Sequence, residues 1–320
     1  MRNDFSVRSG FSHRRFAGLL VVAGLAAVIF ACGVTKSTID PFANATFSDW
    51  SAPINLGSLI NSDAAEQAPA ISPDGLALYY LSGRAGGIGA NDIWVSRRAT
   101  RNAAWEAPKN LGAPINTTAN ETHPAFSPDG LQLYFTSDRP GGFGLNDIWV
   151  STRTNVNDDF SWQAPVNLGP VINSALEDAA PYVVKLNGQN TLFYSRGPIL
   201  TNQDLYISVQ NAGVWGTPTI LTELSTTDAT EAHATVRADG REIFFYSGRT
   251  GGAGGNDIWT STRTTVTAPW STPVAVTALN TSFGEVHPAL DLDGLTIYFA
   301  SNRPGGSGGN DLYMATRTRR

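Results

Sequence analysis

The sequence predicts an all-β fold, a five-bladed β-propeller of four-stranded antiparallel blades. Tryptophans recur 55, 57, 53 and 55 residues apart, at Trp50, Trp105, Trp162, Trp215 and Trp270. Each recurrence opens the same series of short apolar runs, separated by Asp-Gly turns and glycine-rich loops, and helical spacing is absent from it. A fixed period of this length indicates repeated supersecondary units, as in a propeller or solenoid.

Residues 1–31 form a different kind of segment. Four arginines precede an apolar run from Phe16 to Ala31, which is shorter than the roughly 20 residues that a spanning helix needs. This pattern predicts a secretory signal peptide. Its removal leaves 18 basic and 26 acidic residues, a net charge of −8. An acidic body of this kind disfavours binding to nucleic acid or to anionic membrane surfaces.

Cys32 is the only cysteine, so no intramolecular disulfide can form. The segment Ile29-Phe-Ala-Cys32 resembles the lipobox of bacterial lipoproteins, which implies lipidation of Cys32 and a tether over residues 32–46. Simple cleavage and an uncleaved anchor remain alternatives. The expected location is therefore the cell envelope, on the periplasmic or outer-membrane side, with the membrane reached through the lipid anchor alone.

The second unit shows the four strands of a blade most clearly. The first strand is predicted at 123–127, and the turn at Asp129-Gly130 leads into the second at 131–137. A glycine-rich loop leads to the third at 147–152, and the tryptophan segment at 162–168 is the fourth. Apolar residues on both faces of the second strand are typical of a sheet packed between two others.

The chain ends predict ring closure within a domain of residues 47–320. Residues 47–56 are a fourth strand without a blade, and residues 287–318 are a blade without a fourth strand. Pairing of 47–56 with the carboxy-terminal strand near Tyr313 would complete the fifth blade and remove an open sheet edge. A monomer is expected.

The repeats resemble the WD-repeat-like units of the TolB family. The shared pattern is a proline, a Ser-Pro-Asp-Gly turn, an arginine and an aspartate. It recurs in register at Pro69, 72–75, Arg84 and Asp92, at Pro124, 127–130, Arg139 and Asp147, and at Pro288, 291–294, Arg303 and Asp311, where the third copy has Asp-Leu-Asp-Gly in the turn. Blade four is looser, and blade three departs most, with Leu-Asn-Gly at 186–188 and a changed loop at 197–203. The resemblance implies a protein- or glycan-binding scaffold of the envelope.

The glycine-rich loops and the tryptophans of the repeat each allow a structural and a functional explanation. Glycine loops such as 86–92 nearly match a calcium-binding nonapeptide, but the aspartate falls one position late and the copies lie one blade apart. A tight turn with locally bonded aspartate is the favoured explanation. All eight tryptophans occupy repeat positions, which favours blade packing over a platform for sugars.

A glutamate recurs in the predicted inner strand of every blade, and in three blades a histidine stands two residues after it. The glutamates are Glu66, Glu121, Glu177, Glu231 and Glu285, and two residues later stand Ala68, His123, Ala179, His233 and His287. Residues i and i+2 face the same side of a strand, so these side chains are predicted to gather at the channel mouth. They are the predicted binding residues, and His123, His233 and His287 are the ligands of any divalent metal. The alternative is scaffold, with the glutamates paired to Arg84, Arg139, Arg249 and Arg303.

No nucleophile motif is present, so the sequence favours a non-enzymatic binding module over an enzyme. Its expected partner is an envelope protein or a polysaccharide, recognised at the channel mouth or at the loop 197–203, and no cofactor is required. The rival is a metal-dependent lyase or hydrolase acting on polysaccharide. Oligogalacturonate lyases, propellers of similar repeats that hold a metal with histidines, give this rival a precedent. A purely structural lipoprotein is the third alternative.

Overall fold

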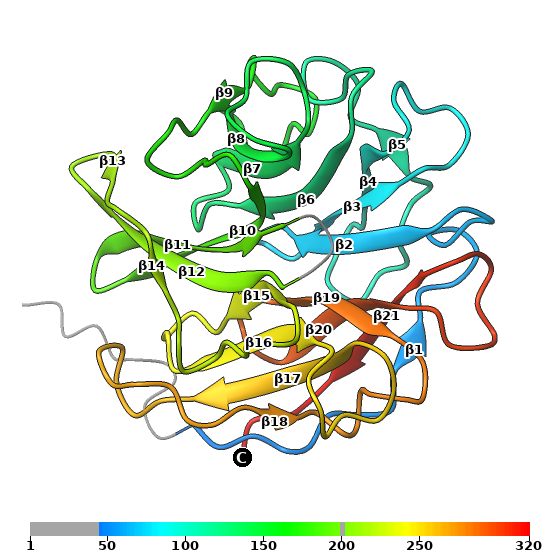
Figure 1. Ribbon diagram of the computed structural model, residues 1–320. Helices are drawn as coiled ribbons and strands as arrows, with labels where there is room; N and C mark the ends of the chain where they lie inside the picture. Colours follow the sequence, from blue (N-terminus) through cyan, green and yellow to red (C-terminus); the bar gives the residue numbers. More distant parts are fainter. Residues whose placement is uncertain (1–44, 199–201) are drawn as a thin grey trace, which may run out of the picture. The chain divides into compact units, whose positions relative to one another are not determined.

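The computed structural model describes residues 45–198 and 202–320, and their regular secondary structure is entirely β-strand. These residues belong to the compact unit Asp40–Arg320, and Figure 1 shows its strands arranged around a central axis. None of the described residues form a helix long and apolar enough to cross a membrane. The predicted leader, Cys32 and most of the tether lie outside the described residues.

Four blades share one strand order, from the channel to the rim. Blade one contains β2 (Glu66–Ile71), β3 (Ala77–Ser82), β4 (Asp92–Arg97) and β5 (Lys109–Asn110), and blade two contains β6 (Glu121–Phe126), β7 (Gln132–Ser137), β8 (Asp147–Thr152) and β9 (Val166–Asn167). Blade four contains β15 (Glu231–Val236), β16 (Glu242–Ser247), β17 (Asp257–Thr262) and β18 (Val274–Ala275), and blade five contains β19 (Glu285–Leu290), β20 (Thr296–Ser301), β21 (Asp311–Thr316) and β1 (Ile54–Asn55).

Blade three is longer and less regular. It contains β10 (Glu177–Leu186), β11 (Gln189–Gly197), β12 (Asp204–Asn211), a short β13 (Val214–Trp215) and β14 (Thr219–Ile220). The inner strands β2, β6, β10, β15 and β19 contact one another in a ring. The predicted five-bladed propeller is therefore confirmed. The fourth strands are shorter than expected, with only two residues each in the ladder.

The ring closes where the sequence predicted. Ile54 pairs with Met314 and Asn55 with Tyr313, and an isolated bridge joins Phe47 to Arg319. The fifth blade thus combines the two ends of the described chain. Because the outer edge of β21 is paired, no long unpaired edge remains there to template aggregation.

Buried aromatic residues pack the blades against one another. Tyr79 of blade one and Phe135 of blade two lie in one core cluster with Trp149 and Trp162, and all four are at most 8% exposed. In every blade except blade three, an arginine after the third strand lies over the tryptophan of the next segment, as Arg153 does over Trp162 at 4.3 Å from the ring centroid. Such contacts explain the repeated tryptophans as packing residues.

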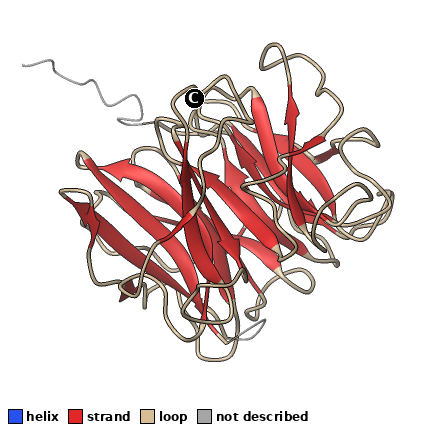
Figure 2. Ribbon diagram, turned by 90° about the horizontal axis from the view of Figure 1, so that it is seen from above, coloured by secondary structure: helices blue, strands red, loops and turns tan. Residues whose placement is uncertain are grey.

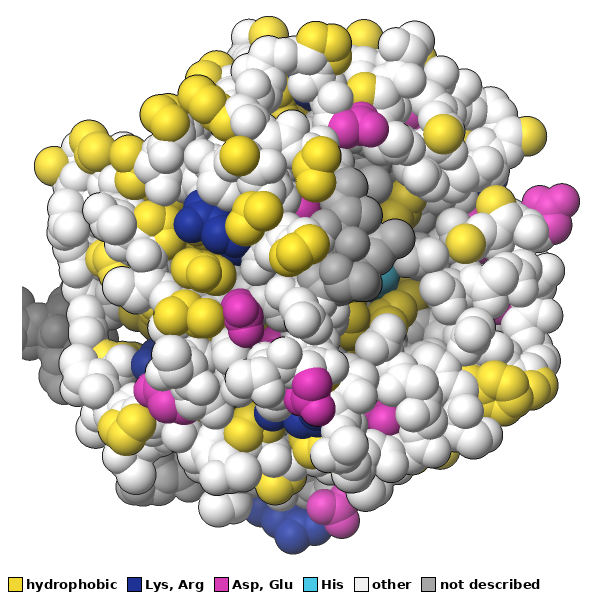
Figure 3. Space-filling view, viewed as in Figure 1, with side chains coloured by type: hydrophobic (Ala, Val, Ile, Leu, Met, Phe, Trp, Pro, Cys, Tyr) yellow, Lys and Arg dark blue, Asp and Glu magenta, His cyan; other side chains and the backbone are white. Residues whose placement is uncertain are grey.

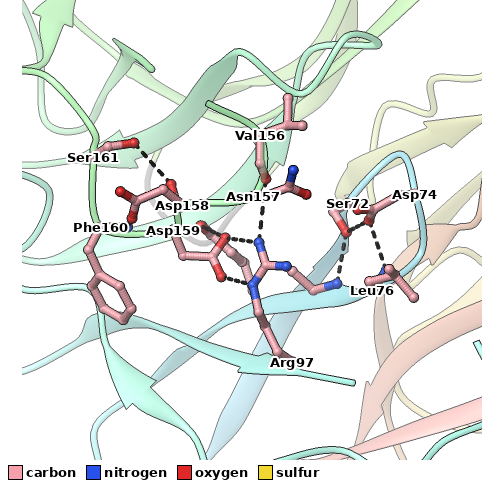
Figure 4. A network of polar contacts seen from close by, with 12 residues as sticks. Ser72, Asp74, Leu76, Arg97, Val156, Asn157, Asp158, Asp159, Phe160 and Ser161 are labelled. Atoms are coloured by element: carbon pink, nitrogen blue, oxygen red, sulfur yellow. Dashed lines mark hydrogen bonds and ion pairs between the residues drawn. The ribbon is translucent and has the colours of Figure 1, made fainter. Parts of the chain in front are cut away.

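A buried carboxylate joins blades one and two away from the channel. Asp159 accepts hydrogen bonds from Tyr79 Oη at 2.9 Å and Arg153 Nη1 at 3.1 Å, and both its oxygens accept from Arg97. Figure 4 shows the Arg97 guanidinium facing Asp159. The Trp162 indole completes the network by donating to Tyr79 Oη at 3.2 Å. Satisfied networks of this kind fix the relative position of two packed sheets.

The glycine-rich loops are tight turns held by their own aspartate. In blade one, Asp92 accepts from Gly89 N at 3.1 Å, Ile88 N and Asn110 Nδ2 at 2.8 Å. A Cβ atom at Gly89 would lie 2.1 Å from the Ala119 carbonyl oxygen, so the loop requires glycine there. The structure thus supports the turn explanation of these loops.

Candidate functional site

A cavity of about 510 Å³ opens at one mouth of the channel. Figure 3 shows the hollow, with a histidine side chain visible inside it. All five blades contribute to its walls. The volume lies within the range of small-molecule sites. At the far side of the inner strands, a smaller apolar cavity of about 50 Å³ is lined mainly by aliphatic and aromatic residues and prolines, and it is too small for a sugar.

The inner strand of every blade carries a β-bulge at the channel. The register shifts at this point in each blade, and the bulge residues adopt a left-handed backbone with φ between 48° and 54°. The five bulge residues are Ala68, His123, Ala180, His233 and His287. Such a conformation is uncommon outside glycine and is often found at functional sites.

The structure brings the three predicted histidines together on the channel axis. The ring centroids of His123 and His233 are 5.4 Å apart, those of His123 and His287 5.1 Å, and those of His233 and His287 5.0 Å. His123 and His287 line the cavity, whereas His233 lines the small apolar cavity beyond it. The rings of His123 and His287 therefore belong to the wall of the wide cavity, and the His233 ring separates it from the small one.

Burial keeps these imidazoles neutral at pH 7. It lowers the pKa of His123 to about 4, and burial together with the neighbouring His123 lowers the pKa of His233 to about 3. The pKa of His287 falls well below its usual value, first through burial and then through the other two rings. His287 Nδ1 is buried without a hydrogen-bond partner, while His233 Nδ1 lies 3.3 Å from the Pro288 oxygen.

Neutral imidazoles are suitable metal ligands. Among the described residues, however, no group of three or more histidine, cysteine, aspartate or glutamate side chains is arranged to hold a metal ion. A metal at His123, His233 and His287 stays a prediction. One ion per chain in the purified protein, lost in His123→Ala, would support it, and a metal-free protein would contradict it.

Four of the five predicted glutamates lie inside the blades and do not line the cavity. Their side chains are 0% exposed and form ion pairs of 2.9–3.0 Å. The pairs are Glu66–Arg84, Glu121–Arg139, Glu231–Arg249 and Glu285–Arg303. We call them the staple glutamates, because each also binds the loop in front of its own strand. Glu121, for example, accepts from Thr117 N and Thr117 Oγ1, each at 2.7 Å.

Blade three changes the residue that makes this staple. Asp178 accepts from Arg196 Nε at 2.6 Å and from Ser174 N at 2.6 Å, so it takes the role of the staple glutamates. The sequence register that aligned Glu177 and Ala179 with the other blades is wrong by one residue, since the bulge falls at Ala180. Two adjacent acids begin this strand, and strand register alone decides which of them meets the arginine.

Because of this shift, Glu177 does not take the place of a staple glutamate and instead lines the cavity. It is 8% exposed, and its two oxygens accept from Asn146 Nδ2 at 2.9 Å and Gln203 Nε2 at 2.7 Å. The equivalent positions in the other blades carry no acid, being Ala65, Asn120, Thr230 and Gly284. Glu177 is therefore a carboxylate that departs from the repeat and is positioned by side chains of blades two and three.

Asp228 is a second cavity carboxylate, and sequence reasoning missed it. It lies on the exposed loop before β15 and lines the same cavity. The loop from Thr226 to Glu231 is one residue longer than its equivalent from Ser62 to Glu66, although both are held by the same hydrogen bonds. This one-residue insertion is the sequence feature from which the different position of Asp228 could have been inferred.

Comparisons with known proteins were made for the whole chain. No protein-family model matches it, and no curated protein matches it. Solved structures do match. The catalytic domain of a GH62 alpha-L-arabinofuranosidase from Coprinopsis cinerea has a TM-score of 0.56 at 16% identity, over 84% of this chain and 97% of that one. The chain resembles arabinanase-type propellers.

Two further solved structures are similar to this chain over most of its length. Native arabinanase from Bacillus subtilis has a TM-score of 0.57 at 14% identity, over 82% of this chain and 96% of that one. An alpha-L-arabinofuranosidase from Podospora anserina, solved in complex with cellotriose, has a TM-score of 0.54 at 15% identity, over 86% and 96%. At this level of identity the likeness shows the fold.

These findings correct three expectations. The propeller prediction holds, but these neighbours are arabinofuranosidases and arabinanases, not TolB-type or WD-repeat proteins. The expectation of a non-enzymatic scaffold is wrong, because the neighbours are glycoside hydrolases and favour the polysaccharide-acting alternative. The same neighbours contradict the expectation that favoured a non-enzyme.

Proposed function

We propose that the protein hydrolyses glycosidic bonds of a polysaccharide in the cavity at the channel mouth. The observation that carries this proposal is Glu177, the carboxylate that leaves the repeat pattern, enters the cavity and has both oxygens held by amide donors. The fold neighbours support it, since structures with this architecture include glycoside hydrolases.

The chemistry follows from the two carboxylates. Glycoside hydrolysis generally uses a pair, in which one acts as base or nucleophile and the other protonates the leaving oxygen. Donors to both oxygens of Glu177 stabilise its ionised form and fix its orientation, which suits the base or nucleophile. Asp228, on the exposed loop before β15, is then the proton donor to the leaving group.

Hydrolysis fits the cavity better than elimination. A lyase removes a proton beside a uronate carboxylate, and cationic groups must stabilise the charge that develops. Among the described residues, no lysine or arginine lines the cavity, and its histidines are neutral. Its other polar groups include Gln67, Gln203 and Asn256, which can donate to and accept from sugar hydroxyls.

The cellular setting is part of the proposal. The charged leader, the apolar run and Cys32 support an exported, lipid-anchored monomer of the cell envelope, where extracellular glycan would be accessible. Incorporation of labelled palmitate into the wild-type protein, and its loss in Cys32→Ser, tests the anchor.

The decisive experiment is Glu177→Gln assayed on arabinan and on xylo- and cello-oligosaccharides. Loss of a positioned acid or base costs about 10²–10⁴ in rate, so release of reducing ends should fall by that factor while folding is kept. Glu106→Gln, an exposed glutamate on the rim of blade one, is the matched control and should retain full activity. Full activity in Glu177→Gln would overturn the assignment, and no cleavage of any neutral glycan by the wild type would overturn the proposed function.

A further inference from the structure

A second large cavity lies on the opposite face of the propeller. Its volume is about 550 Å³. Ala232 of β15 lines the channel cavity, whereas Arg237, just beyond the other end of the same strand, lines this one. Phe47 also lines it, near the start of the described chain and paired with Arg319. Figure 2 shows the C-terminus on this face.

Arginines dominate the walls of this cavity. Arg237, Arg241, Arg263 and Arg317 line it, and Glu242 is the only acid among its described lining residues. We call these four residues the arginine cluster. Such a concentration of positive charge stands out in a chain with more acidic than basic residues. Converging guanidinium groups are typical of sites for phosphate, sulfate or carboxylate.

Part of the cluster is held in place by two carboxylates. Glu242 accepts from Arg317 Nη1 at 2.8 Å, Arg317 Nη2 at 2.6 Å and Arg237 Nη1 at 2.7 Å. Asp239 accepts from Arg237 Nη2 and Arg241 Nε, each at 2.8 Å. These bonds preorganise the guanidinium groups, so a ligand need not order them on binding.

Arg263 differs from Arg153 and Arg317, two of its repeat equivalents. Like Arg153 and Arg317, it lies over a tryptophan and donates Nε to a turn glycine, here Gly240 at 2.6 Å. Arg153 also binds Asp159, and Arg317 binds Glu242.

Among the residues that the structure describes, no acid forms such a bond with Arg263. Its Nη2 is buried without a hydrogen-bond partner, and Asp239 and Glu223 act on it only as nearby charges. A buried guanidinium donor left unpaired is costly, and an oxygen ligand would satisfy it.

We propose that the arginine cluster binds an oxyanion of the phosphate or sulfate type, free in solution or as the head group of an anionic lipid. The site is distinct from the channel cavity and does not depend on the function proposed there. With a lipid head group as ligand, this face would lie against the membrane and the channel cavity would open away from it.

The test measures thermal stabilisation of the purified protein by inorganic phosphate, with chloride at matched ionic strength as reference. Phosphate should raise the unfolding temperature, and its affinity should weaken by about tenfold or more in Arg263→Gln and Arg241→Gln, because each loses a charge-assisted hydrogen bond. Thr264→Glu, which places a carboxylate at the exposed Thr264 of the cavity wall and leaves the arginines intact, should also abolish binding. Arg101→Gln, which removes a half-exposed arginine paired with Asp291 elsewhere, is the matched control.

Vesicles distinguish the two sources of the anion. Retention on phosphatidylglycerol vesicles but not on phosphatidylcholine vesicles, lost in Arg263→Gln and competed by phosphate, supports a lipid head group. Phosphate binding without vesicle retention supports a soluble oxyanion. No stabilisation by phosphate, or stabilisation that Arg263→Gln, Arg241→Gln and Thr264→Glu leave unchanged, overturns the proposal.

Discussion

Glu285→Gln tests whether the staple glutamates are scaffold. Glu285 is 0% exposed, and its carboxylate accepts from Arg303 Nη2 at 3.0 Å, Ser301 Oγ at 2.8 Å, and Thr281 N and Oγ1 at 2.7 Å each. A glutamine keeps the shape but replaces one acceptor oxygen by an NH₂ group, which would face a donor. It also leaves the partly buried Arg303 without its counter-charge.

The magnitude follows from these contacts. Breaking a buried ion pair by removing one charge costs about 3–5 kcal/mol. Arg303 retains its bond to the Leu279 carbonyl at 2.7 Å, so the lower end of that range, about 3 kcal/mol, is expected. For a domain of this size each kcal/mol lowers the unfolding temperature by about 2–4 °C, so the loss should be roughly 6–12 °C.

Urea unfolding followed by tryptophan fluorescence measures the free energy, and glycan hydrolysis at 25 °C measures function. Glu285→Gln should lose stability but keep its kcat/KM, since Glu285 does not line the cavity. Exposed Glu106→Gln should change stability by less than about 0.5 kcal/mol. A loss below about 1 kcal/mol in Glu285→Gln, or a fall in kcat/KM with stability unchanged, would refute the scaffold role.

Three further outcomes are expected. Between pH 7 and 5 the unfolded chain protonates its histidines at their ordinary pKa of 6.5, whereas His123 in the folded protein, with a pKa of about 4, stays neutral. Stability should therefore fall as pH drops, by about 2 kcal/mol per buried histidine, and His123→Asn should flatten a plot of urea midpoint against pH. Asp159→Asn should lower the free energy of unfolding by about 3 kcal/mol, because Arg153 would remain buried without its acid; an unchanged urea midpoint would count against the network in Figure 4. A chain that starts at Gly57 lacks β1, so light scattering should show aggregation through the open edge of β21, while a chain that starts at Ala45 should stay monomeric.

Much of the fold could be predicted from the sequence, because the same pattern of strands and turns recurs in five units. The Asp-Gly turn at Gly130 requires a left-handed glycine, with φ of 71°, and the glycine loops need residues without Cβ. These are local requirements, so they show in the sequence. Closure by residues 47–56 followed from counting strands, and the pairing of Asn55 with Tyr313 confirms it.

The candidate site was only partly readable. The three histidines share one repeat position, and the structure brings them together on the channel axis. Glu177 was singled out for the wrong reason, as a repeat residue, and Asp228 was not found. A one-residue change in register or loop length alters which side chain faces the channel, and composition does not encode that change.

The number of blades, their strand order and the closure of the ring can be read from the amino-acid sequence, because turn chemistry acts over a few residues and recurs in each unit. Which acids are scaffold and which face open space depends on how the blades pack. Glu121 and Glu177 look alike along the chain, yet one is held by Arg139 inside its blade and the other by amides at the cavity. Burial and charge pairing arise between segments far apart in sequence, so they exist only once the blades have packed.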